Sequence, residues 1–142
     1  MADLYELVVD ADLPVDLTAA ERAELRWHLG LGPRPRTLAI VTDFTEIVFT
    51  DDGEPAIVEL PEPLLAERGA ALRVGGPLTG AFTVRDDGAS TLLARQEVHP
   101  DSFLRVGELL RWLERRATRC SARVRFHEDE AYTDVANGDL PG

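Results

Sequence analysis

The amino-acid sequence predicts an α+β fold, with an antiparallel sheet of about six or seven strands packed against two main helices. The chain has 142 residues, enough for one domain. Short segments rich in β-branched residues follow one another without long helices between them, which favours antiparallel pairing. Two longer segments have apolar residues at helical spacing instead. We expect a single domain over residues 1–127 and an acidic, flexible C-terminal tail over 128–142.

In the first half of the chain we expect one helix among short strands. Thr18 and Glu21 have the capping-box spacing that satisfies free amides at a helix start. The helix over 19–29 then ends at Gly30, a residue that tolerates the left-handed conformation found there. A short helical turn is expected at 64–68. The expected strands of this half cover 4–9, before a turn at 10–14, and 37–42, 46–50 and 56–60.

The second half has clearer strand and helix patterns. After strands at 71–74, 81–85 and 91–98, the longest helix is expected to begin near His99 and to run to about Thr118. In the last strand, over 121–127, apolar and polar residues alternate, as expected of a half-buried strand. Val124 therefore faces the core and Arg125 faces away from it.

Charge and cysteine content narrow the function classes. The net charge of −11 disfavours binding to nucleic acid and to anionic membranes. Residues 105–125 contain seven Arg and two acids, whereas the last fifteen residues contain five acids and no Arg, so the tail could fold back on this basic segment. The single Cys120 excludes an internal disulfide. Because acids occupy the N-terminus where a secretion signal has basic residues, we expect a cytoplasmic protein.

The long helix has two apolar residues outside its core stripe. Phe103, Val106 and Leu110 share the stripe, whereas Leu104 and Trp112 project from the opposite side, among arginines. A Trp surrounded by Arg has the composition of a protein-binding hot spot. The alternative is that the tail or a loop of the same chain covers Trp112.

The first helix also has a second apolar strip, which includes Trp27 and would contact a second subunit or the N-terminal segment. Glu24 and His28, four residues apart, are expected to form a surface pair. The predicted partner-binding residues of the two helices are Trp27, Leu104, Arg105, Arg111, Trp112, Arg115 and Arg116.

A second candidate site lies around His99. Arg95, Glu97 and His99 alternate along one strand and could combine an anion site with acid–base chemistry. The competing interpretation is that His99 or Asp101 caps the following helix. Cys120 is expected to be a half-buried thiol. No catalytic residue, metal ligand or cofactor is assigned.

We therefore predict a small acidic protein-interaction module of chaperone, adaptor or immunity type, which binds a protein partner or forms a homodimer. The alternative is a small enzyme or ligand-binding domain with an anion or acid–base site at Arg95, Glu97 and His99. We favour the non-enzymatic class because no nucleophile motif is found in the sequence.

Overall fold

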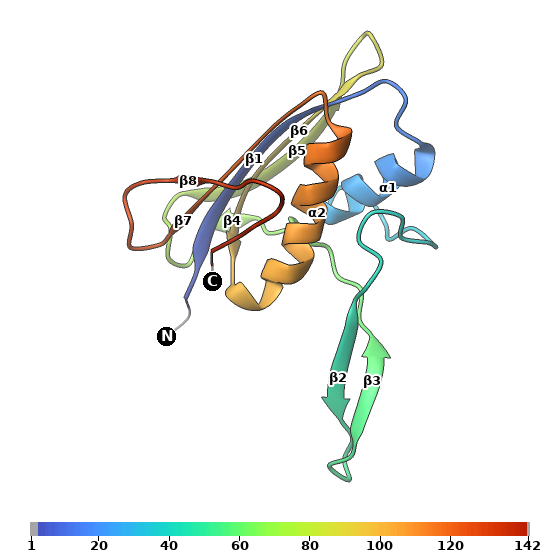
Figure 1. Cartoon of the computed structure of the whole chain (residues 1–142), viewed down its shortest axis with the longest axis vertical. Helices are drawn as coiled ribbons and strands as arrows, with labels where there is room; N and C mark the ends of the chain where they lie inside the picture. Colours follow the sequence, from blue (N-terminus) through green and yellow to red (C-terminus); the bar gives the residue numbers. More distant parts are fainter. Residues whose placement is uncertain (1–2, 142) are drawn as a thin grey trace.

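A computed structural model, which describes residues 3–141, contains a six-stranded antiparallel sheet, a separate two-stranded sheet and two α-helices (Figure 1). The predicted α+β fold class is confirmed. Met1, Ala2 and Gly142, the ends of the predicted domain and tail, lie outside the described residues. The main sheet has the order β4-β5-β6-β1-β7-β8. Its strands are β1 (Tyr5–Leu13), β4 (Gly69–Ala70), β5 (Pro77–Val84), β6 (Ser90–Val98), β7 (Arg119–Phe126) and β8 (Thr133–Asp134).

The centre of the sheet is β1, which pairs antiparallel with β6 on one side and β7 on the other. Its alternate residues Leu7, Val9, Ala11 and Leu13 are buried on the face that the helices cover. The turn predicted at 10–14 is therefore wrong for most of its length. The aspartates at 10 and 12 point to the opposite face, where both accept from the Arg119 guanidinium, so the strand continues through them.

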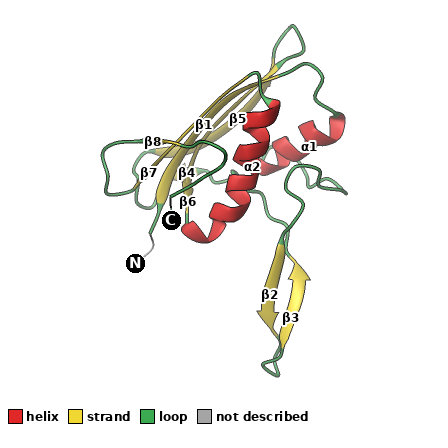
Figure 2. Ribbon diagram, in the orientation of Figure 1, coloured by secondary structure: helices red, strands yellow, loops and turns green. Residues whose placement is uncertain are grey.

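Two helices cover one face of the sheet, as Figures 1 and 2 show. The first helix, α1 (Ala19–His28), begins with the predicted capping box: the Thr18 hydroxyl accepts from the Glu21 amide and the Glu21 carboxylate accepts from the Thr18 amide. The second helix, α2 (Phe103–Arg116), follows a short 3-10 turn, η1 (Pro100–Ser102). Its predicted core stripe is confirmed, since Val106, Leu110 and Leu113 are buried. Neither helix is long and apolar enough to cross a membrane, and the same holds for every helix within residues 3–141.

Strands β2 (Thr45–Phe49) and β3 (Pro55–Glu59) do not join the main sheet. They form a hairpin that projects away from the helices and the main sheet (Figure 2), and we call residues 45–59 the arm. Gly53 in its turn has a φ of 78°, a left-handed conformation that glycine adopts readily. The strands predicted at 46–50 and 56–60 thus form, but as a unit of their own.

Two predicted strands, over 37–42 and 71–74, do not form. In each case a buried carboxylate takes the place of a neighbouring strand. Glu24 accepts from the amides of residues 39–41, and Glu97 accepts from those of residues 72–74. Each of these segments has an irregular backbone, and a single carboxylate side chain accepts the hydrogen bonds of its amides.

Candidate functional site

The Glu24–His28 pair lies inside the protein, so the surface pair predicted for these residues is wrong. Both side chains are fully buried, and Glu24 Oε2 lies 3.0 Å from His28 Nε2. The Leu64 amide donates to His28 Nδ1, which leaves Nε2 as the ring nitrogen that donates to Glu24. Burial alone would raise the pKa of Glu24, but hydrogen bonds from His28 and three backbone amides hold it below its usual value.

The Glu24–His28 dyad holds the segments on either side of the arm against α1. Glu24 holds residues 39–41, which lead into β2, and His28 holds the backbone at Leu64 and Leu65, which follows β3. Arg105 of α2 adds a third anchor, because its guanidinium donates to the carbonyls of Asp43 and Thr45 and pairs with Glu46. The arm therefore projects from a rigid base.

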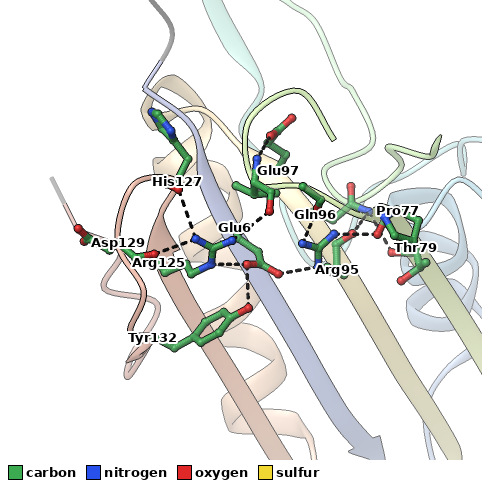
Figure 3. A network of polar contacts seen from close by, with 12 residues as sticks. Glu6, Pro77, Thr79, Arg95, Gln96, Glu97, Arg125, His127, Asp129 and Tyr132 are labelled. Atoms are coloured by element: carbon green, nitrogen blue, oxygen red, sulfur yellow. Dashed lines mark hydrogen bonds and ion pairs between the residues drawn. The ribbon is translucent and has the colours of Figure 1, made fainter. Parts of the chain in front are cut away.

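The residues of the second candidate site are occupied by contacts within the chain. Arg95 Nε donates to Glu6 at 2.5 Å, and its two terminal nitrogens donate to the carbonyls of Gly75 and Pro77 (Figure 3). Both oxygens of Glu97 accept from backbone amides. Each nitrogen of the Arg95 guanidinium and each oxygen of Glu97 thus already has a hydrogen-bond partner within the chain.

Glu6 is the centre of the network drawn in Figure 3. It is 2 % exposed and accepts from Arg95, Arg125 and Tyr132. Burial opposes ionisation, but the hydrogen bonds from Tyr132 and the two arginines outweigh it and keep the pKa of Glu6 below its usual value. Arg125 also donates to the carbonyls of Val74, His127 and Asp129. The network therefore joins the loop before β5 to the chain that follows β7, residues 127–141, which we call the C-terminal segment. This gives the network a structural role.

His99 caps η1, the 3-10 turn that leads into α2, which agrees with the interpretation that His99 has a capping role. Its Nδ1 accepts from the Asp101 amide at 3.1 Å. A hollow of about 370 Å³ lies beside it, lined in part by Leu4, Glu67 and Leu72. Burial and the nearby charge of Glu97 raise the pKa of Glu67. Among the described residues, no group of three His, Cys, Asp or Glu side chains could hold a metal ion.

Most of the predicted partner-binding residues contact their own chain. Trp27 is 7 % exposed and packs edge-on against Phe44 in the core, which leaves it little surface to offer a partner. Trp112 is half-buried against the core. Arg105 anchors the arm, Arg111 donates to the Asn137 carbonyl, and Arg116 pairs with Asp16 and Glu21. Leu104, 77 % exposed, and Arg115 stay at the surface of α2.

The C-terminal segment folds back on the basic part of the chain, but within residues 3–141 none of its five acids forms an ion pair with an arginine there. Tyr132 lies under the guanidinium groups of Arg123 and Arg125, and Glu114 accepts from the Asn137 amide. The segment next to Asn137 lies directly against Gly107 of α2. Cys120 is half-buried as predicted, and burial raises the pKa of its thiol.

The arm carries three exposed large apolar side chains on one face. Ile47 and Ile57 lie opposite each other in the hairpin register and, with Phe49, share one face. These three side chains are 66 %, 76 % and 73 % exposed. The outer edges of β2 and β3 pair with no other strand among residues 3–141. Residues 37–67, which contain the arm, carry eight acids and no basic residue.

The sequence contained a signal for this surface that our prediction missed. Each of the two strands has three consecutive apolar residues, at 47–49 and 56–58, so both faces of the hairpin are apolar. Such a strand needs cover on two sides. Comparison with protein-family models, curated proteins and solved structures gives no match for this chain.

Proposed function

We propose that this protein is a protein-interaction module whose contact surface is the arm, in place of the helix surface that the sequence suggested. The observation that supports this most directly is the exposure of Ile47, Phe49 and Ile57 on one face of a projecting hairpin. Contiguous exposed apolar side chains are typical of interaction sites, and an isolated two-stranded hairpin is marginally stable in water. A bound protein would cover the face and stabilise the hairpin.

The anchoring of the arm also supports this proposal. Glu24 and His28 hold the segments on either side of the arm, and Arg105 holds its base, so the arm leaves the body at a defined position. A pre-organised surface loses less conformational entropy when it binds. The proposal places the protein in the cytoplasm, where its single cysteine would stay reduced.

The alternative of a small enzyme or ligand-binding domain receives less support from the contacts. Its three residues do not converge on a common point: Arg95 binds Glu6 and two carbonyls, Glu97 binds backbone amides, and His99 caps η1. A ligand that used Arg95 and Glu97 together would compete with these contacts.

The test compares one arm variant with one helix variant as baits in an extract of the cells that make the protein. Phe49→Ser and Leu104→Ser each remove one exposed large apolar side chain, from the arm and from α2 respectively. We expect proteins recovered with the wild type, including its own untagged copy, to be recovered with Leu104→Ser and lost with Phe49→Ser. Equal recovery by Phe49→Ser and the wild type would refute the arm as the contact surface, and selective loss with Leu104→Ser would favour the helix surface.

A further inference from the structure

We infer that the partner of the arm is a second copy of this chain, bound arm to arm in antiparallel orientation. This inference rests on the proposed function, since it assigns an occupant to the same surface. The exposed faces of the two hairpins would stack about a twofold axis at the level of the Ile47–Ile57 pair. Each copy would then contribute the same surface, as in an isologous interface.

The first argument is the position of the apolar side chains along the arm. Ile47 and Ile57 form the central cross-strand pair of five, between Thr45–Glu59 at the base and Phe49–Pro55 near the tip. A twofold axis at this central pair brings the isoleucines of both copies together. It also places each Phe49 over the base-proximal half of the other arm. In this arrangement the isoleucines of one arm cover those of the other, and each Phe49 lies over the Thr45–Glu59 pair of the other copy.

The second argument is the distribution of unpaired charge at the two ends of the arm. Asp51, Asp52 and Glu54 form an exposed acidic tip. Arg34 and Arg36 are exposed near the base, where they line a hollow with Glu59. Within residues 3–141, none of the three tip acids and neither of these arginines forms an ion pair.

Antiparallel stacking places the acidic tip of one copy at the basic end of the other, twice in each dimer. Glu46 near the base is already paired with Arg105. Glu59, which accepts from the Thr45 hydroxyl and keeps its charge, is then outnumbered by Arg34 and Arg36 in the hollow that the three side chains line. In a parallel arrangement the two acidic tips would meet and repel each other. Both orientations bring the isoleucines of the two copies together, so the charge distribution is what favours the antiparallel arrangement.

The interface is small, so we expect a reversible dimer. Each copy contributes three large apolar side chains, which places the buried area below the roughly 1,200 Å² typical of stable complexes. We expect a dissociation constant on the order of 10 µM, measured by sedimentation velocity of the purified full chain from about 1 to 500 µM. Ile57→Ser should weaken the dimer at least about tenfold, because it removes two central contacts. The control Leu72→Ser, which changes a side chain 83 % exposed outside the arm, should leave the dimer unchanged.

A charge exchange tests the orientation. The first variant carries Arg34→Glu and Arg36→Glu, so both the base and the tip of its arm are acidic. The second variant carries Asp51→Arg and Asp52→Arg, so the base of its arm and the changed part of its tip are basic. Each variant alone should be monomeric at concentrations where the wild type dimerises, because its tips and bases repel. An equimolar mixture should restore a dimer of one copy of each, since every tip then meets a base of opposite charge. This restored dimer should weaken as salt concentration rises.

The outcomes separate this inference from the proposed function. If the wild-type chain stays monomeric at about 500 µM, the partner is not a second copy. The arm remains the contact surface in that case if a different protein is recovered from the extract with the wild type and lost with Phe49→Ser. A dimer that Ile57→Ser does not weaken also overturns the inference. The antiparallel orientation is overturned if the two charge variants fail to pair. This conclusion requires that the wild type dimerises and that each variant has a native circular dichroism spectrum.

Discussion

The contact between the C-terminal segment and α2 can be tested with one added methyl group. Gly107 lies in α2 where residues 137–138 cross it, and a Cβ atom at Gly107 would lie 2.6 Å from the Gly138 carbonyl oxygen. That distance is too short for any real contact, and the obstructing atom belongs to the backbone. In Gly107→Ala the segment must therefore move away from the helix.

Two opposing effects determine the sign of the stability change. Alanine in place of glycine inside a helix normally stabilises it by about 1 kcal/mol. Moving the segment breaks the Arg111–Asn137 and Asn137–Glu114 hydrogen bonds, of 3.0 and 2.7 Å. Both involve a charged group at the surface, so each contributes about 1 kcal/mol. We expect Gly107→Ala to lower the free energy of unfolding of the full chain by about 1 kcal/mol.

The measurement is urea unfolding of four proteins, followed by far-UV circular dichroism. They are the full chain and a chain ending at Asp134, each with and without the substitution Gly107→Ala. In the shortened chain the clash is absent, so the same substitution should raise the free energy of unfolding by about 1 kcal/mol. The two effects should differ by about 2 kcal/mol. If Gly107→Ala stabilises both chains equally, the segment does not dock on the helix as described.

Two further predictions concern buried and capping side chains. Glu24→Gln should lower the free energy of unfolding by about 2–4 kcal/mol in urea titrations at pH 7, because three backbone amides and His28 lose a charged acceptor. Burial raises the pKa of Glu24 less than its hydrogen bonds lower it, so the pKa in the folded protein lies below the ordinary 4.5. The stability that the ionised Glu24 supplies is therefore present above about pH 4.5. It is lost as the pH falls through the pKa of the folded protein. The wild type should therefore lose stability more steeply than Glu24→Gln between pH 5 and 3, and parallel curves would contradict this assignment. His99→Gln should lower the melting temperature by an amount equivalent to about 1 kcal/mol, the usual cost of a lost cap, and an unchanged melting temperature would count against the capping role.

The features that local rules describe could be predicted from the sequence. The Thr18 capping box depends on residues three positions apart, and the α2 stripe and the alternation in β7 depend on periodicity along a single element. The fold class follows from the order of such elements. Each of these features is decided by neighbours in the chain, which is why the sequence was sufficient for them.

The missed features are decided by residues far apart in the chain. The segments at 37–42 and 71–74 have the composition of strands, but Glu24 and Glu97, which take up their amides, lie at least 15 and 23 residues away. The Glu24–His28 spacing is the same for a surface pair and for a buried dyad. Burial depends on the packing of residues 39–41 and 64–65 over α1, which periodicity does not describe. The partners of Arg95 and Glu97 were missed for the same reason, since they come from other elements.

The buried ionic groups and the exposed apolar arm belong to one arrangement. Burying a carboxylate is costly unless its oxygens are fully hydrogen-bonded, and replacing a buried ionic group by apolar residues is often neutral or stabilising. Core stability alone therefore does not explain Glu24 and His28. Their specific effect is to fix residues 39–41 and 64–65, the segments on either side of the arm, at defined positions. A hairpin that served only as a connection would not need such a base, and its Ile47, Phe49 and Ile57 could pack against the body of the protein. On the proposed function, the dyad would set the orientation in which the arm presents these side chains to another protein chain.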